Sequence, residues 1–413
     1  MDQYLTRYAE PEIAIATQLT GPWDEAVIVP LYEEVAGTLV QSLAEAAQHS
    51  GRKVIAIFVV NARDDSSPSV HSANETLLQQ FTPGLRRVSS LLSLYVIDRA
   101  TPGRRFPPKQ GVGLARKLGG DLALALHRDG KLHSPYFSTT DGDARVAPDY
   151  FELPDQTAIA FHHRYRHEAQ GEATVAHELY EISLRYYARG LAFAGSPYAF
   201  PTIGSTLTVR LDGYAMVRGF PKLLAAEDFY LLAKLAKLGT VAEAPGMVWL
   251  KPRKSDRVPF GTGAATAKIV QQTDEGKEFQ LYHPKTFLWL KRWLEAGNRF
   301  VKHRDLTQVH CELGGDPDSA GIVAILEKLG AFDQLVTAAK TRPNEKDLSR
   351  HLPTAFDAFK TLRFVHEVRD TLLPTVEYRR AMQTSAIAEN GMPQWEDGLT
   401  ASPSQLLERW REL

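Results

Sequence analysis

Two short apolar runs near the start of the chain flank an amphipathic segment. Residues 26–30 and 54–60 are rich in β-branched side chains, and each run is followed by polar residues typical of a loop. Runs of this kind predict strands that are buried on both faces. Between them, residues 35–49 place Leu39 and Leu43 at helical spacing. The pattern predicts a β-α-β unit, in which a helix covers one face of a parallel sheet.

The same alternation continues along the chain. Residues 91–97 and 132–140 predict two further strands. Between them, residues 111–126 carry apolar side chains on one stripe, which predicts a helix packed on the sheet. We therefore expect an α/β fold whose sheet is flanked by helices.

The second half of the chain has a different pattern. Residues 160–190 are rich in His, Arg, Glu and Tyr, and we expect them to form a long helix that ends near Gly190. From residue 284 onward the spacing of apolar positions is helical. The sequence thus predicts an α/β domain over residues 1–275 and a helical C-terminal region over residues 276–413.

Charge and cysteine content narrow the range of functions. The 413 residues include 48 Lys and Arg against 49 Asp and Glu, a formal net charge of −1, so we expect no nucleic-acid partner. The single cysteine, Cys311, rules out an internal disulfide and fits a reducing compartment. Because no apolar run reaches the roughly 18 residues of a spanning helix, we expect a cytoplasmic chain with no transmembrane segment and at most peripheral membrane contact. The N-glycosylation pattern that begins at Asn74 would then not be modified.

Two carboxylates flank a glycine where a predicted strand ends. These residues are Asp141, Gly142 and Asp143. Mg²⁺ and Mn²⁺ favour one or two carboxylates together with phosphate oxygens of a substrate, so this pair could hold a divalent cation against a diphosphate. The alternative is a surface turn, since Asp-Gly is common in turns. No Glu closes a twelve-residue loop, which argues against an EF-hand.

A second acidic pair, Glu227 and Asp228, opens a predicted helix. Acids are favoured in a first turn for structural reasons alone. A functional role would need one carboxylate that accepts a proton from a hydroxyl group. We expect the helix dipole to lower the pKa of Asp228 and keep it ionised. Glu227 would point about 100° away around the helix, towards acceptor or support roles.

The glycine-rich residues 111–120 carry a candidate phosphate ligand. The run lacks the third glycine of a dinucleotide fingerprint, because Arg116 stands there, and no strand leads directly into Gly111. Arg116 could instead bind a phosphate through its forked guanidinium, or simply face solvent. Residues 253–263, which mix arginines and glycines, could form a lid over a diphosphate or a basic surface loop.

A histidine-rich stretch offers a weaker candidate. His163 and His167 have the i,i+4 spacing of a helix face. No third ligand stands at matching spacing, so a solvated helix face is favoured over a zinc site.

Taken in order, these features resemble the family 2 glycosyltransferases with a GT-A fold. That family has a first strand similar to V-I-P-x-Y-N-E, and here residues 27–34 read V-I-V-P-L-Y-E-E. An acidic loop follows the second strand, a helix similar to G-x-x-x-A-R-N-x-G contains the arginine, and a D-x-D strand end precedes an E-D helix. The resemblance covers about residues 25–260 and rests on the joint order of the motifs.

The resemblance implies a GT-A-like, Rossmann-type mixed sheet and a metal-dependent, inverting transfer of a sugar from a nucleotide-diphosphate donor to an acceptor hydroxyl. The acceptor could be a carbohydrate, a lipid-linked molecule or another hydroxyl compound. It implies a divalent cation, Mn²⁺ or Mg²⁺, held by Asp143 as the stronger ligand, with Asp141 nearer the ribose or a metal-bound water. Asp228 would be the general base, with Glu227 beside it. The implied donor-binding residues are Pro30, Tyr32, Glu34, Asn61, Asp64, Arg116 and Asp141.

The chain departs from the family pattern at two positions, and other functions stay open. Glu33 and Lys117 stand where the family has Asn, and no Q-x-x-R-W motif follows Asp228, which argues against a processive polysaccharide synthase. A sugar-phosphate nucleotidyltransferase would show a Gly- and Arg-rich phosphate loop after the first strand, where this chain has Pro30 and Tyr32. A non-catalytic scaffold with a partner-binding helical tail is the third alternative, and the two intact acidic pairs count against it.

Overall fold

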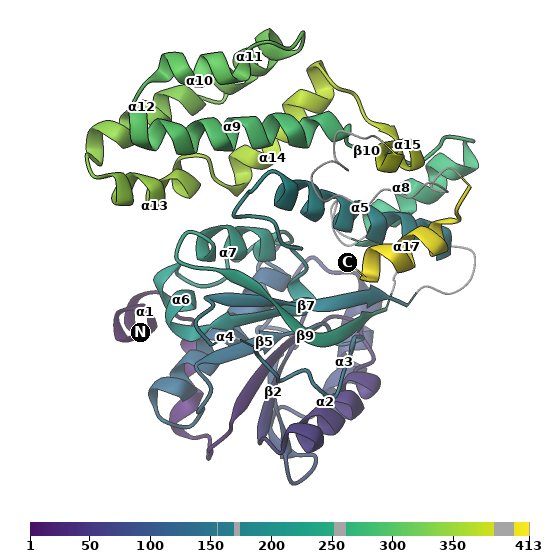
Figure 1. Cartoon of the computed structure of the whole chain (residues 1–413). Coiled ribbons are helices and arrows are strands. Elements are labelled where there is room, and N and C mark those ends of the chain that lie inside the picture. Colours follow the sequence, from purple (N-terminus) through teal and green to yellow (C-terminus); the bar gives the residue numbers. More distant parts are fainter. Residues whose placement is uncertain (155, 169–173, 252–261, 384–399, 413) are drawn as a thin grey trace. The chain divides into compact units, whose positions relative to one another are not determined.

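The computed structural model describes the chain apart from residues 155, 169–173, 252–261, 384–399 and 413 (Figure 1). Its internal contacts divide the chain into two compact units. One comprises residues 1–169 and 202–264, and the other comprises residues 170–201 and 265–413. Our single division after residue 275 stays a prediction. The structure adds that residues 170–201, which interrupt the first unit in sequence, group with the second.

The first unit is built on a mixed sheet. Within the described residues it has nine strands in the order β3-β4-β2-β1-β5-β8-β7-β9-β6. The strands are β1 (Glu25–Leu31), β2 (Val54–Asn61), β3 (Gly84–Arg87), β4 (Leu92–Arg99), β5 (Tyr136–Thr139), β6 (Arg145–Val146), β7 (Ala160–His167), β8 (Leu207–Arg210) and β9 (Val241–Leu250). Neighbouring strands among β4, β2, β1 and β5 are parallel, whereas β8 is antiparallel to both β5 and β7.

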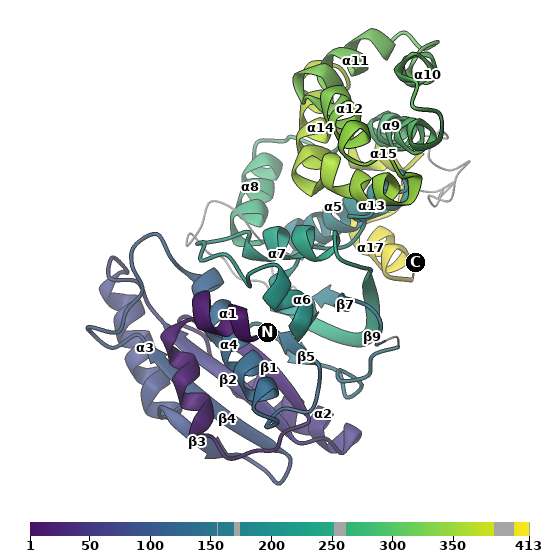
Figure 2. The same ribbon diagram turned by 90° about the vertical axis from the view of Figure 1, so that its left-hand side faces the viewer.

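Helices cover both faces of this sheet. They are α1 (Asp2–Arg7), α2 (Gly37–Ser50), α3 (Pro68–Gln80), α4 (Val112–Arg128), α6 (Leu211–Met216) and α7 (Glu227–Leu235), with 3-10 turns at Pro11–Thr17 and Gly204–Thr206. Helix α4 packs against β1 and β2. Figures 1 and 2 show α4 on one face and α2 and α3 on the other, as right-handed crossovers require. The predicted mixed sheet flanked by helices is confirmed.

The strand register brings the predicted site loops to one edge. Ile28 of β1 lies opposite Ile57 of β2 and opposite Thr139 of β5. Parallel strands end at the same edge of a sheet, so the loops that follow β1, β2 and β5 meet there. In open α/β sheets this carboxyl edge is where ligands bind.

The expected helix over residues 160–190 is wrong in its first part. Residues 160–167 form β7, and the helix α5 (Thr174–Phe193) begins only after it. In β7, Phe161, His163 and Tyr165 are buried, whereas Arg164 between them is exposed. This is the two-residue period of a strand. His163 and His167 therefore do not lie on a helix face.

Lys117, which departs from the family pattern, belongs to a buried network that holds the N-terminus. Its Nζ donates to Asp121 Oδ2 at 2.9 Å and to the Tyr4 hydroxyl at 2.7 Å. The hydroxyls of Tyr4 and Tyr214 in turn donate to Asp121 Oδ1 at 2.5 and 2.9 Å. Because buried charges need partners, this network fastens α1 to α4 and gives Lys117 a structural role.

The second unit is helical, as predicted for the C-terminal region. It contains α5, α9 (Pro284–His303), α10 (Leu306–Leu313), α11 (Ser319–Lys328), α12 (Ala331–Thr341), α13 (Glu345–Ala355), α14 (Ala358–Thr371), α15 (Tyr378–Gln383), α17 (Pro403–Glu412) and most of α8 (Thr262–Asp274). Two short strands, β10 (Gln280–Leu281) and β11 (Val376–Glu377), pair antiparallel.

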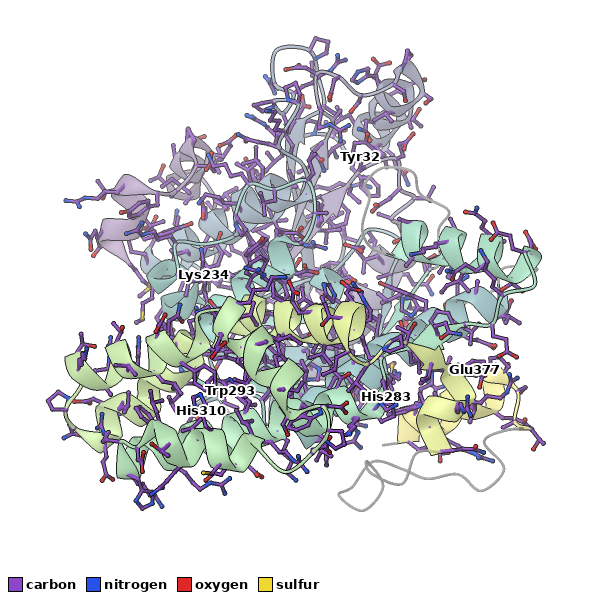
Figure 3. The ribbon with its side chains drawn as sticks, turned by 90° about the horizontal axis from the view of Figure 1, so that it is seen from above. Tyr32, Lys234, His283, Trp293, His310 and Glu377 are labelled. Atoms are coloured by element: carbon purple, nitrogen blue, oxygen red, sulfur yellow. The ribbon has the colours of Figure 1, made fainter. Side chains whose placement is uncertain are left out.

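Aromatic packing and one buried ion pair hold this unit together. The rings of Trp293 and His310, labelled in Figure 3, both pack on Phe332, with centroid distances of 5.4 and 4.6 Å. Arg411 of α17 pairs with the fully buried Glu181 of α5 at 2.9 Å. In the part of the chain that the structure describes, no helix has the length and apolar character needed to cross a membrane.

Candidate functional site

Arg116 of α4 joins the two acidic pairs that the sequence singles out. Its guanidinium is buried, with 5% of the side chain exposed. Nη2 donates to Asp141 Oδ1 at 2.7 Å, and Nη1 donates to Glu227. Nε donates to the hydroxyl of Thr139, the last residue of β5, at 3.2 Å. One side chain thus connects α4, the end of β5 and the start of α7, and neither of our two expectations for Arg116 anticipated this arrangement.

The backbone at Gly204 makes room for the guanidinium. A Cβ added at this glycine would lie 2.3 Å from Nη1 of Arg116, closer than non-bonded atoms can approach. Gly204 opens the 3-10 turn that precedes β8. From the sequence alone, the loop of residues 195–204 could line an acceptor pocket or simply connect two elements, and neither interpretation relates Gly204 to Arg116. The sequence contains no signal for this contact, because Gly204 and Arg116 are far apart along the chain.

Asp228 lies beside this cluster and carries a raised pKa. Burial and, after it, the neighbouring Glu227 carboxylate raise the pKa of Asp228 to about 7, although Arg116 and two backbone hydrogen bonds favour the ionised form. One of these bonds is donated by the Phe229 N–H at 2.7 Å. Our expectation that the helix dipole would lower this pKa is wrong, because desolvation outweighs the dipole.

The start of α7 is held in an uncommon conformation. Ala226, which precedes the acidic pair, has φ +63°, and no side chain caps the helix. A left-handed non-glycine residue costs on the order of 1–3 kcal/mol and persists only where the surrounding structure holds it in place. Glu227 itself is buried, and its carboxylate is bound by Arg116.

The turn that carries Asp141 and Asp143 is fixed by Glu34. The Gly142 N–H donates to Glu34 Oε2 at 3.0 Å, and a Cβ on Gly142 would lie 2.2 Å from the Leu31 side chain. Glu34 is itself buried. The glycine therefore permits a close approach to the loop after β1, and Glu34 connects that loop to the acidic turn.

The remaining predicted donor residues fall into two groups. Pro30 is buried within β1, and the Asn61 amide donates to the carbonyl oxygens of Leu31 and Val59, so both support the ends of the strands. Tyr32, which is labelled in Figure 3, is half-buried, and its hydroxyl lies 3.2 Å from Ser66 Oγ. Asp64 has an exposed side chain and is positioned by a hydrogen bond from its own backbone N–H to the Phe106 carbonyl.

Carboxylates outnumber cations in this cluster, which bears on metal binding. Asp141, Glu227 and Asp228 share the single guanidinium of Arg116, while Asp143 stands half-buried across Gly142. Among the described residues, no group of three or more His, Cys, Asp or Glu side chains is arranged to hold a metal ion. Two carboxylates on one turn fit a cation that takes its other ligands from phosphate and water.

Two other sequence features are the histidine-rich stretch and the residues expected to form a lid. His163 is fully buried, burial lowers its pKa to about 3, and its Nε2 lies 2.9 Å from the Thr208 hydroxyl. It is thus a neutral core residue. Most of the lid expected over residues 253–263 lies outside the described residues.

No family model and no curated protein matches this chain. Among solved structures, it is similar to the mannosyltransferase PcManGT from Pyrobaculum calidifontis in complex with GDP-Man and Mn²⁺, with 16% identity, a TM-score of 0.33, and coverage of 85% of this chain and 92% of that one. It is also similar to a mycobacterial protein, with 14% identity, a TM-score of 0.30, and coverage of 66% and 83%. TM-scores this low establish no shared fold, so the assignment of function rests on the residues of this chain.

The close approach at Gly204 leads to a test of the cluster. We expect Gly204→Ala to displace Arg116 and to lower the free energy of unfolding by about 1–3 kcal/mol, as overpacking of a buried site does. Gly297→Ala in α9 is the matched control, because a Cβ there meets no atom within 4 Å. Urea unfolding of both variants measures the difference. Equal stability would contradict the proposed packing of Arg116 on Gly204.

Proposed function

We propose that this chain is a nucleotide-sugar-dependent glycosyltransferase of the family 2 type, with a GT-A fold and inverting, metal-dependent transfer to an acceptor hydroxyl. The supporting observation is the Arg116 cluster. It joins a carboxylate at the end of β5, where a diphosphate would lie, to the acidic pair that opens α7. Donor recognition and proton removal would therefore depend on one group of side chains.

In this proposal Asp228 is the general base. A pKa of about 7 leaves the carboxylate partly ionised at neutral pH and more basic than an ordinary Asp. It would accept the proton of the acceptor hydroxyl as the new glycosidic bond forms. Glu227 would act as a positioning residue, since its carboxylate holds Arg116.

The donor would bind at the carboxyl edge of the sheet. The guanidinium of Arg116 would supply positive charge near the diphosphate, and the half-buried Tyr32 and the exposed Asp64 would contact the nucleoside. Asp143 and Asp141 would hold a divalent cation, which when bound stabilises the negative charge of the leaving diphosphate. Glu34 and Asn61 would support this pocket from behind.

A thermal-shift panel of nucleotides and nucleotide sugars, each with and without Mn²⁺, tests the function. A ligand at 100 times its dissociation constant should stabilise the fold by about 2.7 kcal/mol. A shift that needs both a nucleotide sugar and Mn²⁺ would support the proposal. A shift with nucleoside triphosphates and sugar phosphates alone would favour a nucleotidyltransferase, and no shift with any ligand would favour the scaffold alternative.

The two acidic pairs should have separable roles. We expect Asp228→Asn to reduce transfer by about 10²–10⁴-fold while donor binding survives, because only the base is lost. Asp143→Asn should weaken Mn²⁺-dependent donor binding and transfer together. Calorimetry with donor and Mn²⁺, paired with a transfer assay, separates these effects. If Asp228→Asn kept full activity, Asp228 would not be the base.

The raised pKa of Asp228 also predicts a pH profile. The base must be deprotonated to act, so kcat/KM for the donor should rise about tenfold per pH unit below the pKa of Asp228 and level off above it. That pKa is about 7 before a cation binds, and a bound cation should move the levelling-off to a lower pH. The residual activity of Asp228→Asn should lack this rise. A wild-type profile that levelled off near pH 4 would mean that an ordinary carboxylate, or another group, acts as the base.

A further inference from the structure

Asn74 of α3 has a fully buried side chain whose amide connects two loops of the site. Its Oδ1 accepts the Glu33 N–H at 3.0 Å, and its Nδ2 donates to the Asn61 carbonyl at 2.8 Å. The amide oxygen thus accepts and the amide nitrogen donates, and the two bonds connect the end of β2 with the loop that follows β1. A buried amide that satisfies both loops restrains each relative to the other.

Glu33, the partner of Asn74, has an uncommon backbone conformation. Its φ is +59°, in the left-handed region. Asn and Asp tolerate this region because their short side chains hydrogen-bond locally, whereas the longer Glu has no such preference. The family pattern described above has Asn at this position. With Glu at this position, the left-handed backbone is supported by Asn74, whose Oδ1 accepts the Glu33 N–H.

The conformation of Glu33 determines the direction of its neighbours. Tyr32 on one side places its hydroxyl near Ser66, and Glu34 on the other accepts the Gly142 N–H at 3.0 Å. A loop that relaxed at Glu33 would move both. We propose that Asn74 is a positioning residue of the donor site, which keeps Glu33 left-handed and thereby fixes Tyr32 and Glu34. The expected effect of Asn74 on the donor KM rests on the proposed function, whereas its effect on the conformation of the loop after β1 does not.

The first test removes the amide. In Asn74→Ala we expect the donor KM to rise about tenfold while kcat changes less than about threefold, because the loop and not the base is disturbed. Hydrogen exchange of the peptide that spans residues 31–35 should become faster. Leu77→Ala on the same helix is the control, since it removes a buried side chain that has no hydrogen-bonding group. It should lower thermal stability and leave the donor KM and this exchange unchanged. Asn74→Ser replaces Asn74→Ala if the latter does not fold.

The second test is a rescue. Glycine adopts a positive φ without strain, so Glu33→Gly should restore the donor KM and part of the lost stability in the Asn74→Ala background but not in Leu77→Ala. Additive effects of the two changes, or unchanged exchange in Asn74→Ala, would overturn the proposal. If the wild-type protein uses no nucleotide sugar, the proposed function fails. The role of Asn74 is then still tested by the hydrogen exchange of residues 31–35 and by whether the stability effects of Asn74→Ala and Glu33→Gly are additive.

Discussion

The buried guanidinium of Arg116 is the constraint on which the site depends. Placing a charge in a protein interior costs several kcal/mol unless partners and hydrogen bonds compensate for the lost water. Here those partners are Thr139 and Asp141, at and just after the end of β5, and Glu227 at the start of α7. Removal of either carboxylate would leave Arg116 short of a partner, so the end of β5 and the start of α7 cannot move apart without a large penalty. The backbone approach at Gly204 completes the enclosure.

Arg116 carries one positive charge, whereas three carboxylates, those of Asp141, Glu227 and Asp228, lie near it. This excess of negative charge bears on the proposed chemistry. Burial and, after it, the neighbouring Glu227 carboxylate raise the pKa of Asp228 to about 7, and the guanidinium of Arg116 offsets only part of this rise. A divalent cation near Asp141 and Asp143 would draw charge from the same cluster and lower the pKa of Asp228. Donor binding and the activation of the base would then be coupled through electrostatics, without any conformational change.

The sequence predicted what depends on local pattern and missed what depends on distant partners. The runs that form β1 and β2 and the apolar stripe of α4 specify their elements directly, and these predictions are confirmed. The two-residue period of β7 could not be recognised in the sequence, because His and Tyr side chains occur both buried and exposed and so do not mark one face of a strand. The roles of Arg116 and Gly204 could not be predicted, since they depend on an approach between residues 88 positions apart in sequence. The pKa of Asp228 likewise depends on burial, which the first turn of a helix does not specify.

Both departures from the family pattern have an explanation in the residues around them. Lys117 pairs with Asp121 within a network that holds the N-terminal helix, so its role is structural. Glu33 keeps a backbone conformation that its side chain does not favour, because Asn74 accepts its N–H. In each case a buried polar side chain outside the motif holds the residue in place: Asn74 accepts the Glu33 N–H, and Asp121 pairs with Lys117. A comparison of motifs does not reveal these partners, because they lie elsewhere in the sequence.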